Sequence, residues 1–226
     1  MSVQQTIEKS LEILLKQKIK ILGAGRTDTG VHAKQMYAHF DFDEPIDLEN
    51  LIYKLNAFLN KDIGIANIHK VRHNSHARFD AISREYEYYI TQIKDVYNHD
   101  KKYFFSKKLD FDKIDKAIDI LKNTKNFKSF CRTKSDVTNY NCEIFDFNYE
   151  IKESEIIFRI RANRFLRNMV RSLIGTILDV SLNKISVKNL LEIIEKSNRI
   201  YAGPSVPAHA LFLSNVEYPK NVFLNE

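Results

Sequence analysis

The sequence predicts an α+β protein built from two pseudo-equivalent α/β sandwich subdomains. Each subdomain is expected to have a mixed, mostly antiparallel sheet with helices on one face. Two observations support this fold class. Both halves of the 226-residue chain alternate segments of helical and strand periodicity, and only 6 glycines and 4 prolines are available for turns. We expect subdomains at 1–74 and 75–226, flanking a basic cleft.

The first subdomain is expected to hold two helices and three strands. Residues 3–16 carry apolar side chains at helical spacing, and a second helix follows the capping residue Asp47 and continues through residue 59. The strands are expected at 18–24, 33–42 and 63–73, because these segments are rich in residues that favour strands.

The second subdomain is expected to contain three helices and three further strands. A tyrosine-rich strand at 77–93 joins the two subdomains, and Tyr86 and Tyr88 share one of its faces because side chains alternate along a strand. Core packing is the usual role of such tyrosines. The helices are expected at 112–122, 165–179 and 187–197, and the strands at 142–151, 155–161 and 210–218.

The composition argues against membrane-spanning and disulfide-rich secreted proteins. The apolar runs are far too short to cross a bilayer, and the N-terminus lacks the pattern of a secretory signal. Cys131 and Cys142 make neither a disulfide framework nor a metal knuckle, so we expect two free thiols in the core of a cytoplasmic protein. Lysine and arginine exceed aspartate and glutamate by 35 − 29 = 6, a moderate excess that suits a polyanionic partner.

The segment from Gly25 to Ala33 is the most informative part of the sequence. Gly25 and Gly30 permit a tight turn that presents Arg26 and Asp28 from a rigid loop. A cation and a carboxylate two residues apart can bind phosphate and supply a nucleophile in one pocket. The alternative is an ordinary turn in which Asp28 bonds its own backbone.

Three arginines gather on the expected helix at 165–179 and just before it. At about 100° per residue, Arg164, Arg167 and Arg171 fall within one sector, while apolar residues fill the opposite side. This pattern predicts one face packed in the core and another that offers guanidinium groups to a cleft. A solvated basic face is the alternative.

Three histidines, His69, His73 and His76, have spacings that would place them together on a helix. The surrounding residues favour strands, and no cysteine, aspartate or glutamate completes a ligand set nearby. We therefore expect no metal site.

Five stretches of the sequence stand in the order of a known set of motifs. They are GRTDTGVHA at 25–33, HARFDA with REYEY at 76–88, FKSFC at 127–131, RANRFL with MVR at 161–171 and PAHALFLSNVEYP at 207–219. Together they cover nearly the whole chain, and they resemble the motifs of the tRNA pseudouridine synthases of the TruA family.

This resemblance implies isomerisation of uridine to pseudouridine in the anticodon stem-loop of tRNA, on a base flipped out of its stack. It implies that Asp28 is the nucleophile, attacking either the sugar or the base first, and that Arg171 pairs with the Asp28 carboxylate. Tyr86 is implied to stack on the target uracil and to assist proton removal. Arg26 is implied to help hold the flipped nucleotide, and Leu211 to close the pocket.

The resemblance also implies partners and excludes cofactors. The isomerisation involves no redox step or group transfer, so we expect no cofactor. tRNA is the expected partner, with Arg164 and Arg167 on its phosphates, and the family implies a homodimer with tRNA lying across both subunits. The first alternative is a catalytically inactive tRNA-binding module of the same fold. The second is a structural protein with no RNA role.

The sequence departs from the family pattern in two places. Family members carry a strand before the first helix, whereas this sequence begins at that helix with Ser2-Val3-Gln4. The first strand of subdomain 1–74 is therefore expected to be missing. Ala210 stands where the family commonly has glycine.

Overall fold

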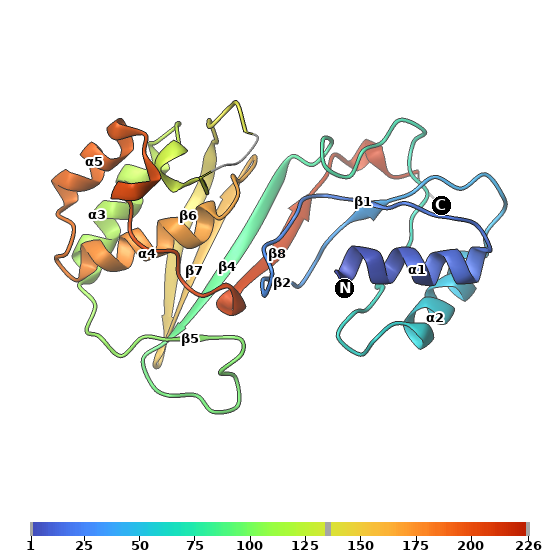
Figure 1. The fold of residues 1–226 in the computed structure, drawn as a ribbon, viewed down its shortest axis with the longest axis horizontal. Helices are drawn as coiled ribbons and strands as arrows, with labels where there is room; N and C mark the ends of the chain where they lie inside the picture. The colour runs from blue at the N-terminus through green and yellow to red at the C-terminus, as the bar shows by residue number, and fades with distance from the viewer. Residues whose placement is uncertain (1, 134–136, 225–226) are drawn as a thin grey trace. The chain divides into compact units, whose positions relative to one another are not determined.

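The computed structural model describes residues 2–133 and 137–224 and has a mixed α+β fold. Its contacts divide the chain into two compact units that alternate along the sequence (Figure 1). The first unit comprises the described residues of Met1–Arg26, Met36–Ala81 and Tyr218–Glu226, and the second those of Thr27–Gln35 and Ile82–Glu217. The sequence suggested one boundary near residue 74. The segment 27–35 instead groups with the second unit, because its short strand pairs there.

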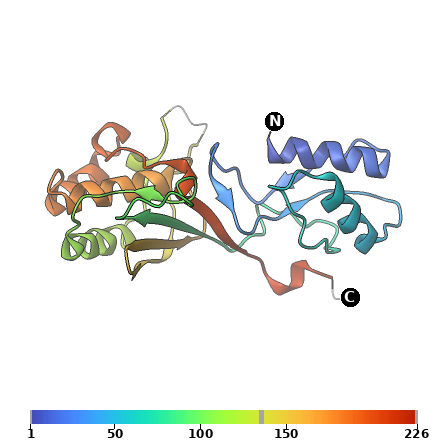
Figure 2. The same cartoon turned by 90° about the horizontal axis from the view of Figure 1, so that it is seen from below.

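Two capped helices, α1 (Val3–Leu15) and α2 (Leu48–Phe58), form the first unit and lie side by side (Figure 2). Ser2 and Gln5 make a reciprocal capping box at the start of α1, and the Asp47 carboxylate accepts the Asn50 N–H at the start of α2. The predicted helices are confirmed to within a residue or two at either end. A small core of buried apolar residues lies between them, made of Leu11, Ile19, Ile21, Leu51, Leu55 and Leu59.

The expected strands of the first unit are mostly absent. Among the residues of this unit that the structure describes, the only strands that pair are β1 (Leu22–Gly23) and β3 (Ala38–His39), in antiparallel orientation. The reason is visible at Ile21, whose N–H donates to the Glu8 carboxylate at 3.1 Å and whose carbonyl accepts from Gln4 Nε2 at 2.9 Å. Side chains of α1 thus satisfy the peptide groups that a neighbouring strand would otherwise satisfy.

The segment 63–73 shows the same arrangement. The Asn56 side chain on α2 accepts the Ile65 N–H at 2.7 Å and donates to the Ile65 carbonyl at 2.8 Å. Within 63–73, all of which the structure describes, the only strand-like pairing is an isolated bridge between Val71 and Phe223. The predicted strand there is wrong.

The second unit is built on a six-stranded sheet with the order β2-β8-β4-β7-β6, and β5 pairs with β4. β2 runs parallel to β8 and β5 parallel to β4, whereas the other pairs are antiparallel. A register shift interrupts the β4–β8 pairing between Glu85 and Tyr86. The strands are β2 (His32–Ala33), β4 (Ser83–Thr91), β5 (Tyr103–Phe104), β6 (Ile144–Lys152), β7 (Glu155–Ala162) and β8 (Leu211–Glu217).

Helices α3 (Phe111–Lys122), α4 (Met169–Ser181) and α5 (Val187–Lys196) belong to the same unit (Figure 1). Tyr88 and Ile90 of β4 and Ile156, Phe158 and Ile160 of β7 join the helices in one large apolar core. Side chains at alternate positions therefore point to the opposite face of the sheet. The core fixes the position of α4, which carries Arg171.

Candidate active site

The segment 27–31 forms a tight turn ahead of β2. The Val31 N–H donates to the Asp28 carbonyl at 3.1 Å, and Gly30 has φ +83°, a left-handed conformation that favours glycine. The backbone conformation of Gly30 thus confirms that the turn needs a glycine at this position. Gly25 shows no such need, because its φ is not positive and a Cβ there would meet no described atom within 4 Å.

The Asp28 carboxylate lies between two guanidinium groups. Its Oδ2 accepts a hydrogen bond from an Nη of Arg171 at 3.1 Å, and its Oδ1 lies 3.8 Å from Nε of Arg167. Both members of the shorter pair are largely buried, with side-chain exposures of 18% for Asp28 and 20% for Arg171. The structure therefore brings together the carboxylate and the arginine that the resemblance paired.

Arg171 is itself held by the backbone of Val206. Nε of Arg171 donates to the Val206 carbonyl at 2.8 Å, and the Val206 N–H donates to the Arg171 carbonyl at 3.2 Å. One edge of the guanidinium is thus fixed by the protein, while the other edge faces the carboxylate. Val206 was not predicted from the sequence; its position directly before the motif at 207–219 was the available signal.

The segment 203–206 approaches α4 closely. A Cβ on Gly175 would lie 1.7 Å from the Pro204 carbonyl oxygen, and one on Gly203 would lie 2.8 Å from Cα of Thr176. The Thr176 hydroxyl also accepts the Gly203 N–H at 2.9 Å. Peptide groups therefore pack directly against the helix one turn after Arg171.

The expected helix at 165–179 begins only at Met169, so the prediction that Arg164, Arg167 and Arg171 share one helix face is wrong. Asn168 has φ +65°, and the Met169 N–H donates to the Leu166 carbonyl, so the chain turns before the helix begins. Arg167 is exposed in this turn but still lies near Asp28. Arg164 is half-buried before it.

Tyr86 lies half-buried on β4, with its ring edge-on to Phe165 at a centroid distance of 5.1 Å. Burial raises the pKa of Tyr86 to about 12; the Asp28 charge acts in the same direction and Arg84 opposes it. The hydroxyl is therefore protonated at neutral pH, and Tyr86 and Asp28 both belong to the second unit.

The other two residues singled out in the sequence lie in different surroundings. Leu211 begins β8, is 5% exposed and pairs in register with Tyr88, so it belongs to the apolar core. Arg26 is exposed and ends the first segment of the other compact unit. The structure thus assembles Asp28, Arg171, Arg167 and Tyr86 within one unit.

Comparison with known proteins places the chain in a family. A family model described as tRNA pseudouridine synthase matches residues 117–219. The chain is 46% identical to tRNA pseudouridine synthase A of Parabacteroides distasonis, over 99% of the chain and 89% of that protein. The chain belongs to the tRNA pseudouridine synthase A family. The proteins named tRNA pseudouridine synthase A in Azobacteroides pseudotrichonymphae and Bacillus subtilis are 44% and 36% identical to the chain. These alignments cover 99% and 96% of the chain and 90% of each relative.

In this tRNA pseudouridine synthase A family member, His69 and His76, two of the three histidines considered as metal ligands, contact other side chains or the backbone. Nδ1 of His76 accepts the N–H of Arg78 at 3.1 Å, and the rings of His69 and His76 contact aromatic neighbours. Across residues 2–133 and 137–224, no group of three or more histidine, cysteine, aspartate or glutamate residues is placed to hold a metal ion.

Two further features concern the thiols and the helices of this tRNA pseudouridine synthase A family member. Cys131 and Cys142 are buried and not disulfide-bonded, as expected, and burial raises the pKa of Cys142 to about 11. None of the helices in the described parts of the chain is long and apolar enough to cross a membrane.

Proposed function

We propose that this protein isomerises uridine to pseudouridine in the anticodon stem-loop of tRNA, with Asp28 as the nucleophile. The observation that carries the proposal is the largely buried Asp28–Arg171 pair at 3.1 Å, in a chain 46% identical to a tRNA pseudouridine synthase A. An inactive RNA-binding module would have no use for a carboxylate held in this way close to RNA phosphates.

The reaction breaks the bond between N1 of uracil and C1′ of the sugar and forms a bond between C5 and C1′. The proton on C5 leaves and N1 gains one, so atoms and electrons balance without a cofactor. Asp28 supplies the electron pair that attacks the sugar or the base. Arg171 orients its carboxylate, and the fixed contact of Arg171 with Val206 sets the direction of approach.

Tyr86, on β4, has a role in binding the flipped base in this proposal. The target base must leave its stack to reach Asp28, at a cost of a few kcal/mol that contacts in the pocket offset. An aromatic ring near the carboxylate offers a stacking surface for the flipped uracil, and its protonated hydroxyl can donate to a polar edge of the base. Leu211 closes the apolar side of this pocket in the proposal, and Arg26 helps to hold the flipped nucleotide.

The partners follow from the same proposal. tRNA is bound through its phosphates by Arg164, Arg167 and surface lysines, in a basic cleft. The net charge of +6 supports a polyanionic partner. The protein acts in the cytoplasm as a homodimer, with tRNA lying across both subunits.

Tritium release from unmodified tRNA labelled at C5 of uridine tests the proposal. Wild-type protein should release tritium, because C5 loses its hydrogen in the reaction, whereas Asp28→Asn should release none and should still bind tRNA. The substitution is nearly isosteric and removes the negative charge.

Asp179→Asn is a matched control, because Asp179 also pairs with a basic side chain, at 2.8 Å from Lys184. It should release tritium at the wild-type rate. Equal release by Asp28→Asn and wild type would reject Asp28 as the nucleophile. Tight tRNA binding without release by wild type would favour an inactive module.

A further inference from the structure

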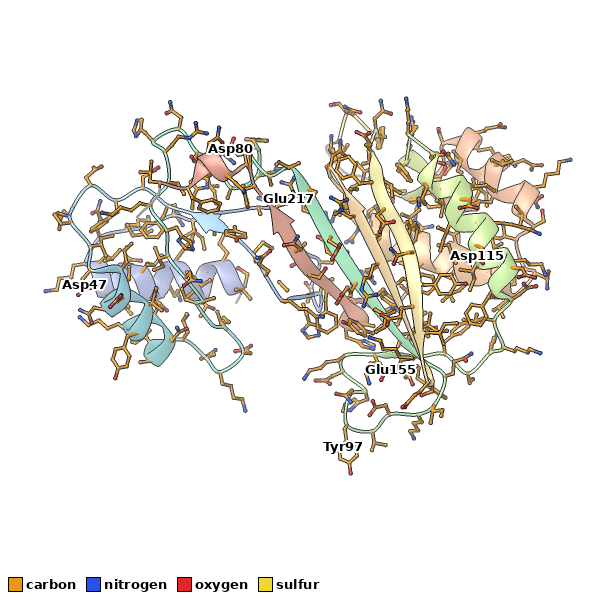
Figure 3. All side chains as sticks on the ribbon, turned by 180° about the vertical axis from the view of Figure 1, so that it is seen from behind. Asp47, Asp80, Tyr97, Asp115, Glu155 and Glu217 are labelled. Atoms are coloured by element: carbon orange, nitrogen blue, oxygen red, sulfur yellow. The ribbon has the colours of Figure 1, made fainter. Side chains whose placement is uncertain are left out.

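A group of polar side chains crosses the sheet of the second unit on the face opposite its helices. Figure 3 shows the strands in front of α4, with Glu155 labelled at one end of β7 and Glu217 at one end of β8. Glu87 on β4 lies in register with Arg159 on β7 and with Phe212 on β8. We call Lys34, Glu87, Tyr89 and Arg159 the cross-sheet network.

Lys34 reaches the network from the segment that carries Asp28. It directly follows β2, yet its Nζ passes over β8 to β4 and lies 5.9 Å from the centroid of the Phe212 ring. There it donates to Glu87 Oε2 at 2.5 Å and to the Tyr89 hydroxyl at 2.7 Å.

Glu87 receives three donors in all. Besides Lys34, the Tyr89 hydroxyl donates to Oε2 at 2.6 Å and Arg159 Nε donates to Oε1 at 3.2 Å. Burial acts to raise the pKa of Glu87, but these hydrogen bonds outweigh it and hold the pKa below its ordinary value. The carboxylate is therefore ionised at neutral pH, and both of its oxygens accept hydrogen bonds.

The backbone alone anchors the Asp28 segment weakly. β2 pairs with β8 over only two residues, His32 and Ala33. Beyond it, the Lys34 N–H donates to the Leu213 carbonyl at 2.8 Å. So short a parallel pairing contributes little by itself, and the side chain of Lys34 adds a second attachment on a different strand.

Glu87 also follows Tyr86 directly on β4. One carboxylate is therefore linked through Lys34 to the segment that carries Asp28 and through the backbone to the residue that carries the Tyr86 ring. If this linkage positions the segment, loss of the Lys34–Glu87 contact should shift the nucleophile relative to that ring.

We propose that Lys34 and Glu87 are positioning residues, which hold the Asp28 segment in a fixed position relative to Tyr86. This inference rests on the function proposed above, in which Asp28 and Tyr86 act on one uracil. Neither residue needs to touch the substrate. Displacing a reacting group by about 1 Å can cost about a hundredfold in rate, so a positioning contact of this kind has a measurable effect.

The test compares Lys34→Met with the matched control Lys184→Met. Lys184 makes a similar ion pair, with exposures of 54% and 13% for Lys184 and Asp179 against 48% and 12% for Lys34 and Glu87. Amide hydrogen exchange at Val31, whose N–H closes the Asp28 turn, should speed up about tenfold in Lys34→Met and stay at the wild-type rate in the control. This readout does not depend on catalysis.

Single-turnover rates on tRNA provide the second readout. At saturating tRNA, Lys34→Met and Glu87→Gln should each be slower by about tenfold, while their dissociation constants for tRNA change less than about threefold. Lys34→Arg should retain most of the rate because it keeps the charge and the donors. Tyr89→Phe, which removes only one hydroxyl, gives a milder variant with the same direction of change.

The outcomes separate the two proposals. If Lys34→Met matches Lys184→Met in both exchange and rate, the positioning role is rejected. If Lys34→Met weakens tRNA binding at an unchanged rate while Glu87→Gln has no effect, Lys34 is a phosphate contact and the inference is again wrong. If wild type forms no pseudouridine, the proposed function fails, and the Val31 exchange still decides whether Lys34 holds the segment.

Discussion

At the scale of single residues, the defining feature is a guanidinium whose two sides have different partners. Arg171 donates from Nε to the backbone of Val206 and from an Nη to Asp28. We expect Arg171→Lys to lower the single-turnover rate by about ten- to hundredfold, because one ammonium cannot keep both contacts and a hydrogen bond to a charged group contributes about 1.5–3 kcal/mol.

Arg167→Lys is the control for this substitution. Arg167 lies 3.8 Å from the same carboxylate and is exposed, so its replacement should change the rate by less than about threefold. Rates measured at saturating tRNA distinguish the two variants. An Arg171→Lys protein as fast as Arg167→Lys would show that the fixed geometry of Arg171 is not needed.

Tyr86→Phe separates the hydroxyl from the ring. We expect turnover to fall about tenfold while the dissociation constant for tRNA stays within about threefold, because only the donor is removed. A raised pKa favours the protonated form, so Tyr86, with its pKa of about 12, ionises only as the pH rises towards that value. Wild type and variant should therefore show rate profiles of the same shape between about pH 6 and about pH 9. Unchanged turnover would leave stacking as the only role of Tyr86.

The sequence predicted some features of the site and not others. The glycine-flanked loop with its carboxylate and cation was also compatible with an ordinary turn, so the role of Asp28 as nucleophile and its pairing with Arg171 both came from the resemblance. The shared helix face of the arginines was wrong because Asn168 adopts a left-handed conformation, which ends the continuity that the 100° spacing assumes. The hydrogen bond from Arg171 to the Val206 carbonyl could not be predicted, since a backbone carbonyl has no sequence signature.

At the scale of elements, the turn that presents Asp28 depends on one glycine. Gly30→Ala would force a side chain into φ +83° and place its Cβ 3.4 Å from that of Ala208, at a cost of about 1 kcal/mol. We expect a lower single-turnover rate and a slightly lower melting temperature. Gly25→Ala should change neither, because its φ is not positive and no described atom lies within 4 Å of the added Cβ. Equal effects of the two substitutions would contradict this account.

The elements of the second unit were far more predictable than those of the first. Its long strands carry alternating apolar residues that enter one core, so periodicity gave β6, β7 and β8 to within about two residues. In the first unit, Glu8, Gln4 and Asn56 provide the hydrogen bonds that a strand partner would provide. Strand propensity cannot reveal such a replacement, because the partner is a side chain distant in sequence.

At the scale of the whole molecule, net charge governs how the proposed partner binds. With a charge of +6, the protein should bind tRNA mainly by releasing counterions, so affinity should fall about a hundredfold or more between about 50 mM and about 200 mM salt. Binding titrations at several salt concentrations measure the slope, and a melting temperature that stays constant over the same range controls for unfolding. A flat dependence would exclude phosphate contacts as the main source of affinity.

The close approach of Pro204 to Gly175 has a consequence for how the protein tolerates mutation. Large apolar residues in a core can exchange with one another, since neighbouring side chains repack. Where peptide groups touch a helix directly, as Pro204 does at Gly175, nothing can rotate out of the way. Libraries of random variants should therefore retain activity after many changes among the leucines and isoleucines around α4, yet lose it with almost any replacement of this one small residue.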